Sequence, residues 1–265
     1  MIIQEMYQVD AFASELFKGN PAAVCIRKQW LPDEVMQAVA SENNLAETAF
    51  AVPEAGGYGI RWFTPETEVA LCGHATLATA HILFNTLETE ASRISFLSRQ
   101  RGILEVSRSG DWLVLDFPED TIASVEMPDL LKEALGGNPR SCWKGLTDYM
   151  VVYDTEKEIR DLKPNYHMLD QIPVRGVIAT SRGNTQDFVS RFFAPNCGVP
   201  EDPVTGSAHT TLTPYWAKNL QKKELSASQL SPRGGLLRCE MAGDRVKIAG
   251  QAITYMKAEI YLPEN

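Results

Sequence analysis

Runs of alternating or continuous apolar residues divide the chain into short segments, most of which predict strands. Residues 1–12 alternate between apolar and polar side chains, and residues 46–52 form an apolar run with Glu47 near its start. Residues 30–41 instead carry apolar side chains at helical spacing, with Pro32 in the first turn. Many strands without regular strand–helix alternation are typical of an α+β protein rather than a doubly wound parallel sheet.

A polar stretch at residues 118–127 is the best candidate for a linker, because a new helix-like segment and further short apolar runs follow it. We therefore expect an N-terminal lobe at residues 1–118 and a C-terminal lobe at residues 128–252. A last strand, near residues 253–265, is free to pack back onto the first lobe. Lobes of about 130 residues have an ordinary domain size.

An internal repeat supports two similar lobes. The segment RWFTP at residues 61–65 matches RFFAP at residues 191–195, and Gly73-His74-Ala75 matches Gly206-Ser207-Ala208. Each copy reads as a strand, a loop and a helix that opens at the glycine, and the second copy has the longer loop. The repeat predicts two helix N-termini that face a shared cleft.

Composition and net charge exclude some classes of binding partner. Hydrophobic residues make up 44% of the chain and charged residues 22%, and the formal net charge is -9. These values are ordinary for a globular protein and argue against non-specific binding to nucleic acid or to anionic membranes. No apolar run is long enough for a transmembrane helix. From the charge and this absence together, we expect neither a nucleic-acid nor a membrane partner.

The cysteines and histidines argue against a disulfide framework and a metal site. The five cysteines form no CxxC pair, which indicates a reducing compartment. The four histidines show no HxH or HExxH spacing, so we expect no metal site. The N-terminal residues lack the pattern of a signal peptide, and the expected location is the cytoplasm.

The two glycine-led helix starts are the first candidate site. Free N–H groups and a partial positive charge suit a helix N-terminus to a carboxylate or a developing anion. Gly73 and Gly206 would serve an anionic substrate and its enolate-like intermediate in this way. The alternative is that both glycines merely permit tight turns.

Glu47 and His74 are candidates for proton transfer. Glu47 opens an apolar strand, where burial would raise its pKa towards neutrality and suit it to give and take protons. His74 lies in the first turn of a helix, where the dipole disfavours the cation, so we expect a neutral imidazole that hydrogen-bonds or relays a proton. A salt-bridged or solvated Glu47 and a structural His74 are the alternatives.

Asp202, Ser207 and Cys72 complete the set. Asp202 precedes the second helix start, either as an N-cap or as a group that orients the substrate, and Ser207 lies outside any GxSxG elbow. Cys72 at a helix N-terminus would have a lowered pKa and could act as a base. The second half has no matching cysteine, so a symmetric two-thiol mechanism lacks its partner.

Four segments together resemble the phenazine-biosynthesis PhzF-like isomerases. They are FKGNPAAVC (residues 17–25), NLAETAF (44–50), RWFTPETEVALCGHAT (61–76) and EDPVTGSAH (201–209). The resemblance covers nearly the whole chain in the family's order. It implies the diaminopimelate epimerase-like fold, in which two similar lobes each wrap a curved sheet around a central helix, with the active site between them.

The same resemblance implies roles for individual residues. Glu47 becomes the acid/base, and His74, Asp202 and Ser207 become substrate-contacting and proton-relay residues. Gly73 and Gly206, together with the neighbouring Cys72 and Ala75, line the substrate site. The family's best-known activity isomerises trans-2,3-dihydro-3-hydroxyanthranilate without metal or organic cofactor, and its members tend to be homodimers.

The sequence thus favours a cofactor-independent isomerase that moves a proton between carbons of a small carboxylate-bearing substrate. An amino-acid epimerase or racemase is an alternative that needs a second thiol. A non-catalytic binding protein that has kept the fold is another, and it predicts ligand binding without exchange of any carbon-bound proton.

Overall fold

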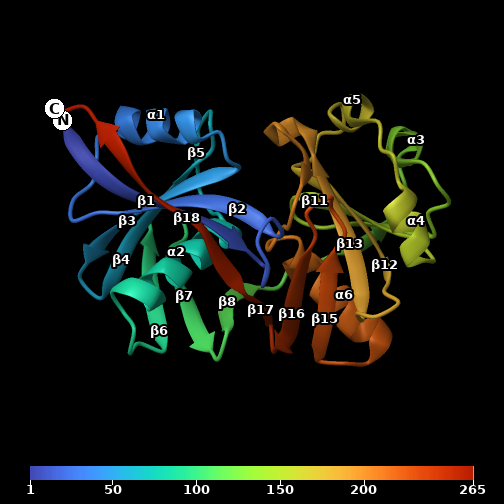
Figure 1. Ribbon diagram of the computed structural model, residues 1–265. Coiled ribbons are helices and arrows are strands. Elements are labelled where there is room, and N and C mark those ends of the chain that lie inside the picture. The colour runs from blue at the N-terminus through green and yellow to red at the C-terminus, as the bar shows by residue number, and fades with distance from the viewer. Residues whose placement is uncertain (265) are drawn as a thin grey trace. The chain divides into compact units, whose positions relative to one another are not determined.

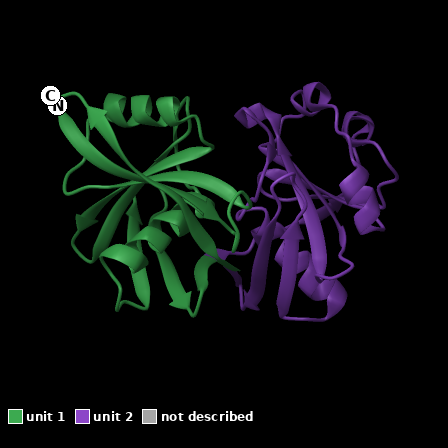
Figure 2. Cartoon of the chain, in the orientation of Figure 1, with its two compact units in different colours: residues 1–116, 249–265 green, residues 117–248 purple. Residues whose placement is uncertain are grey.

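A computed structural model describes residues 1–264 of the chain (Figure 1). The chain divides into two compact units (Figure 2). Unit 1 comprises Met1–Asp116 together with the C-terminal segment that starts at Ala249, and unit 2 comprises Phe117–Ile248. The structure is a mixed α+β fold with many strands and few helices, as the sequence pattern predicted.

Unit 1 is built on a mixed sheet in the order β18, β1, β2, β3, β4, β6, β7 and β8. The pairs β2–β3 and β4–β6 are parallel, and the others are antiparallel. A short strand, β5, pairs with the end of β4. The strands are β1 (Ile2–Ala11), β2 (Asn20–Ile26), β3 (Glu47–Glu54), β4 (Gly57–Phe63), β5 (Glu68–Val69), β6 (Arg93–Ser98), β7 (Gly102–Ser109), β8 (Trp112–Pro118) and β18 (Ala252–Leu262).

Helix α2 (Gly73–Thr86) is the central helix of unit 1 (Figure 1). Most of its side chains are small or apolar and are buried, and it packs against β1, β2, β3, β7 and β18. A helix that is apolar on all sides is stable only when it is enclosed. The curved sheet therefore surrounds α2 and fixes the position of its N-terminus.

Helix α1 (Asp33–Asn43) covers the other side of this sheet with one buried face of Met36, Val39 and Ala40. We expected it at residues 30–41. It begins later because Pro32 takes the N-cap position with an extended backbone. It ends at Asn43, because the next residue, Asn44, has a left-handed backbone conformation that terminates the helix.

Unit 2 repeats the strand pairing of unit 1. Its order is β9, β10, β11, β12, β13, β15 and β16, with β11–β12 and β13–β15 parallel. The strands are β9 (Ala123–Val125), β10 (Ser141–Lys144), β11 (Asp148–Val152), β12 (Gly176–Arg182), β13 (Phe188–Ala194), β14 (Val199–Asp202), β15 (Glu224–Gln229), β16 (Gly235–Ala242) and β17 (Arg245–Gly250). The helices are α3 (Asp129–Leu135), α4 (Glu156–Asp161), α5 (Tyr166–Leu169), the 3-10 turn Pro195–Cys197 and α6 (His209–Leu220).

The pairing β11–β12–β13–β15–β16 follows the same sequence of parallel and antiparallel contacts as β2–β3–β4–β6–β7. Helix α6 occupies the place of α2 in this repeat. The matching segments RWFTP and RFFAP end β4 and β13. The arginines of the two motifs make equivalent ion pairs: Arg61 donates two hydrogen bonds to the Glu68 carboxylate, and Arg191 donates two to the Glu201 carboxylate.

Two boundaries differ from the sequence prediction. The expected linker at residues 118–127 contains β9, which pairs with β10, and Asp120 accepts a hydrogen bond from the Thr211 hydroxyl, so this stretch is part of unit 2. Helix α6 begins at His209 and not at Gly206. Residues 206–208 form a preceding turn, in which the His209 N–H donates to the Gly206 carbonyl at 3.0 Å.

Among residues 1–264, no helix combines the length and the apolar character that crossing a membrane requires.

Candidate active site

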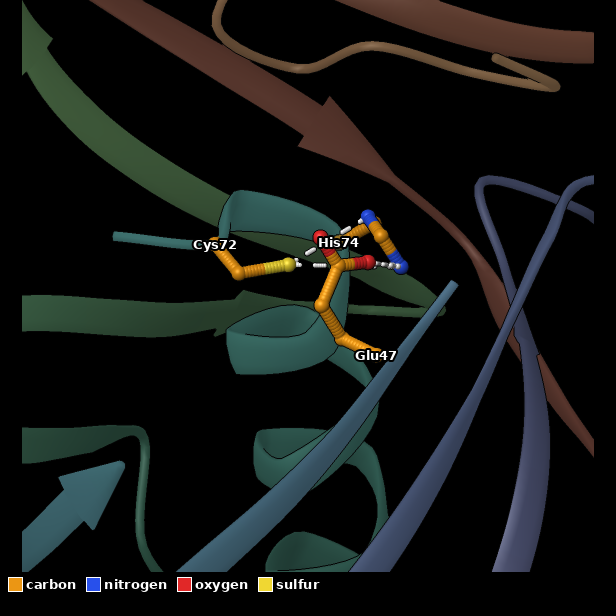
Figure 3. Close-up of side chains that lie close together, drawn as sticks. All are labelled: Glu47, Cys72 and His74. Atoms are coloured by element: carbon orange, nitrogen blue, oxygen red, sulfur yellow. Dashed lines mark hydrogen bonds and ion pairs between the residues drawn. The ribbon is translucent and has the colours of Figure 1, made fainter. Parts of the chain in front are cut away.

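Three side chains of unit 1 meet at the N-terminus of α2 (Figure 3). Nε2 of His74 lies 3.1 Å from Oε2 of Glu47, and Nδ1 of His74 lies 3.4 Å from Sγ of Cys72. His74 is 7% exposed and Glu47 is 19% exposed. The cluster is therefore sheltered: Oε2 of Glu47 is buried, and about a fifth of the Glu47 side chain as a whole stays exposed.

The local fold explains this meeting. Glu47 is the first residue of β3, and Gly73 is the first residue of α2, with Cys72 at the N-cap. Ala75 is completely buried, so the first helical turn lies against the core. Asn20, at the start of β2, places its side-chain amide nitrogen 3.3 Å from Nδ1 of His74. The imidazole is thus held by neighbours from β2, β3 and the helix itself.

The ionisation of the Glu47–His74 pair differs from the sequence-based expectations of a raised Glu47 pKa and a neutral His74 imidazole. Burial alone would raise the pKa of Glu47, but attraction to His74 outweighs it and the pKa falls below its ordinary value. Burial alone would lower the pKa of His74, but its interactions with Cys72 and with the Glu47 carboxylate raise that pKa well above its ordinary value. Near neutral pH the pair is a carboxylate beside an imidazolium, because direct contact between opposite charges exceeds the helix dipole effect.

Cys72 also differs from the expectation of a reactive thiol. Burial raises the pKa of Cys72 to about 11, and the negative charge of Glu47 acts in the same direction. A thiol of this pKa is almost fully protonated near pH 7. The helix N-terminus does not compensate, so Cys72 is a poor candidate for a base.

The same trio offers one oxygen, one sulfur and one nitrogen atom within 4.8 Å of one another, and zinc takes ligands of these types. Binding a cation would require both the Cys72 thiol and the His74 imidazolium to lose protons. The raised pKa values of both groups oppose that loss. Metal binding at this trio would therefore carry the cost of releasing both protons.

A second polar cluster lies in unit 2, ahead of α6. Asp202 ends β14 and accepts a hydrogen bond from the Thr205 hydroxyl. Gln229 fixes the loop at residues 202–205. Its side chain donates to the Asp202 carbonyl at 2.7 Å and accepts from the Thr205 N–H at 2.9 Å. The N-cap of α6 is Ala208, so Asp202 does not cap the helix.

Gly206 and Ser207 follow directly in the turn before α6. Since the first N–H groups of a helix lack intrahelical partners, this turn presents backbone donors, as the first turn of α2 does. Ser207 is half-buried, and its hydroxyl accepts a hydrogen bond from Arg175 at 2.8 Å. The structure thus places Asp202, Gly206 and Ser207 in one cluster of unit 2, and Glu47, Cys72, Gly73, His74 and Ala75 in another cluster of unit 1.

His209, the first residue of α6, stabilises the unit 2 cluster through a hydrogen bond to Thr205. It is completely buried, and its Nδ1 lies 2.9 Å from the Thr205 carbonyl oxygen, which can only accept, so this ring nitrogen carries a proton and donates. Burial lowers the pKa of His209 to about 4.

We predict that His209 makes the protein sensitive to mild acid. Its folded pKa of about 4 lies below an unfolded value near 6.5, so its contribution is present above pH 6.5 and is lost as pH falls towards 4. The loss between pH 7.5 and pH 4.5 amounts to about 2 to 3 kcal/mol. Urea unfolding of the wild type and of His209→Gln at both pH values measures it. Equal pH dependence in the two proteins would contradict the prediction.

Sequence reasoning missed Asn20, Arg175, Asp148 and Gln229 as parts of these clusters. Asn20 lies within FKGNPAAVC, one of the four segments that carry the family resemblance. Arg175 and Gln229 contact the EDPVTGSAH segment from far along the chain, and Asp148 contacts Arg175.

Comparisons with known proteins agree with this architecture. The family model described as phenazine biosynthesis-like protein matches residues 9–258. A Pseudomonas aeruginosa protein named as an uncharacterized isomerase is 51% identical over 257 residues, which are 97% of this chain and 98% of that protein. The crystal structure of a PhzF-family phenazine biosynthesis protein from Enterococcus faecalis is 45% identical, with a TM-score of 0.96, and the match covers 98% of this chain and 100% of that one.

A more distant structural neighbour shares the fold alone. It is a hydroxyproline epimerase from Agrobacterium vitis, which is 11% identical with a TM-score of 0.61 over 97% of this chain and 92% of that one. The epimerase-like fold that the sequence predicted is therefore confirmed. By family model, sequence identity and fold together, the chain belongs to the phenazine biosynthesis-like protein family and is an isomerase of the PhzF type.

Proposed function

We propose that the protein moves a proton between two carbons of a small carboxylate-bearing substrate, with Glu47 as the acid/base and without a cofactor. The observation that carries the proposal is the sheltered Glu47–His74 pair, whose carboxylate and imidazolium lie 3.1 Å apart at the start of α2. A positioned carboxylate that is ionised at neutral pH is a ready general base.

The reaction needs two proton transfers at the same carboxyl group. In the first, a C–H bond of the substrate breaks, the proton goes to Glu47, and the electron pair delocalises over the substrate. In the second, the Glu47 carboxyl returns the proton to a different carbon and the double bond shifts. The His74 imidazolium offsets the negative charge of the intermediate, together with the free N–H groups of the first turn of α2.

The low pKa of Glu47 limits the substrate class. A weakly basic carboxylate removes a proton at a useful rate only where the resulting carbanion is strongly delocalised. The substrate should therefore carry an unsaturated or carbonyl group next to the reacting carbon. A cyclic enoic acid, such as a cyclohexadiene carboxylate of the trans-2,3-dihydro-3-hydroxyanthranilate type, meets this requirement.

For unit 2, we propose that Asp202 and Ser207 bind polar groups of the substrate and that the backbone at Gly206 contributes a donor. The support is local: Gln229 and Thr205 fix the loop that carries Asp202, and His209 fixes the turn that carries Ser207. A preorganised loop binds without the entropic cost of ordering it.

The direct test is proton exchange in deuterated water. The wild-type protein is incubated with a panel of small cyclic unsaturated carboxylic acids, and NMR follows the loss of individual C–H signals. Site-specific loss at one carbon, accompanied by a shifted double bond, supports the isomerase. Binding of panel members without any exchange would contradict it.

We predict that replacing Cys72 with serine lowers the exchange rate by less than about fivefold, because a buried, protonated thiol contributes packing rather than basicity. An amino-acid epimerase or racemase would instead depend on Cys72 as one of its two bases, and the loss would then be about 10²-fold or more. The NMR exchange rate of Cys72→Ser on the best panel substrate distinguishes the two. Exposed Cys197→Ser is the matched control.

A further inference from the structure

A buried carboxylate holds Arg175 in unit 2. Nε of Arg175 donates to Oδ1 of Asp148 at 2.9 Å, and Nη2 donates to Oδ2. Asp148 is 1% exposed, and the guanidinium also packs over the Phe192 ring, 5.3 Å from its centre. A two-point contact fixes the plane of the guanidinium as well as its position.

The third nitrogen of this guanidinium reaches Ser207. Nη1 of Arg175 donates to the Ser207 Oγ at 2.8 Å. A guanidinium has donors only, so the serine oxygen must accept, and the hydroxyl proton must point elsewhere. Within the described residues the hydroxyl has this one protein partner, and Ser207 is only half-buried. Its proton is therefore available to an acceptor outside the protein.

We propose that Arg175 is a positioning residue that turns the Ser207 hydroxyl into a donor for the carboxylate of the bound substrate. The inference rests on the proposed function, since that function supplies a carboxylate-bearing substrate. Asp148 in turn positions Arg175.

The rival explanation is that Arg175 and Asp148 form a purely structural ion pair. The two explanations differ in one measurable way. If Arg175 acts through Ser207, its removal matters only while the Ser207 hydroxyl is present. If it is structural, its removal has the same effect with or without that hydroxyl.

A double-mutant cycle on ligand binding makes this distinction. NMR titration with cyclohex-1-ene-1-carboxylate gives the dissociation constant for the wild type, Arg175→Met, Ser207→Ala and the double variant. We expect each single variant to bind about tenfold more weakly, since one charge-assisted hydrogen bond is lost. The double variant should bind within about twofold of Ser207→Ala, because nothing remains for Arg175 to orient.

Controls separate binding from folding. Arg140→Met removes an exposed arginine of the same unit and should leave binding unchanged.

Cys197 is the exposed cysteine, and its thiol donates to the Arg175 carbonyl at 3.6 Å, whereas the other four cysteines are buried. Alkylation by iodoacetamide at a single cysteine therefore verifies the fold near Arg175. If Arg175→Met is alkylated more than once, Asp148→Asn replaces it in the cycle.

Equal losses from Arg175→Met with and without the Ser207 hydroxyl would overturn the proposal, as would a wild-type protein that does not bind the probe. Failure of the proposed function would appear instead as the absence of Glu47-dependent deuterium exchange, which this cycle does not measure.

Discussion

Replacing Glu47 with glutamine is expected to lower the rate of deuterium exchange into the substrate by about 10³-fold or more, because the amide can neither accept nor return a proton. Glutamine has nearly the same volume and can still hydrogen-bond to His74, so substrate binding should stay close to normal. Exchange is measured by NMR in deuterated water, and binding is measured by titration in ordinary water.

Glu54→Gln is the matched control, since Glu54 ends the same strand whose first residue is Glu47. It should keep the full exchange rate. If Glu47→Gln retained wild-type turnover while the control behaved as expected, Glu47 would not be the acid/base. A loss of binding equal to the loss of exchange would indicate a binding role instead.

Replacing Arg191 with methionine is expected to lower the free energy of unfolding by about 3 to 5 kcal/mol, because it leaves Glu201 without its partner. Both side chains of this ion pair are only 10% exposed. Arg191 also donates to the carbonyls of Ile159 and Leu162, which would lose a buried donor. Urea unfolding followed by circular dichroism measures the loss.

Arg140→Met again serves as the control, because the exposed Arg140–Asp154 pair should contribute less than about 1 kcal/mol. The variant Arg191→Met with Glu201→Met tests the reason for the loss. Removing the stranded carboxylate as well should recover part of the stability. If Arg191→Met unfolded at the same urea concentration as the wild type, the buried pair would not stabilise unit 2.

Local patterns predicted the elements that carry the unit 1 cluster. The apolar run after Glu47 became β3 beginning at that residue, and Gly73 became the first residue of an enclosed helix. These features depend on neighbouring residues, which the sequence shows directly. The repeated RWFTP and RFFAP segments predicted two similar lobes, and in the structure these motifs end the equivalent strands β4 and β13.

The charge state of the Glu47–His74 pair could not be predicted from local sequence patterns. The helix dipole and the burial of Glu47 are visible in the sequence, but the 3.1 Å contact with His74 is not, and that contact decides both pKa values. Arg175 was missed for a similar reason. Its partners Asp148 and Ser207 lie 27 and 32 residues away, and only the pairing of β11 with β12 brings Arg175 close to Asp148.

The pairing of β18 with β1 has a consequence for biosynthesis on the ribosome. Every residue of unit 2 emerges before β18 does, so unit 2 can reach its folded state while β1 still lacks one neighbour. Unit 1 closes only when residues 252–262 have been translated. A nascent chain stalled before that point would expose the edge of β1, which offers unpaired backbone groups to other chains and calls for chaperone protection.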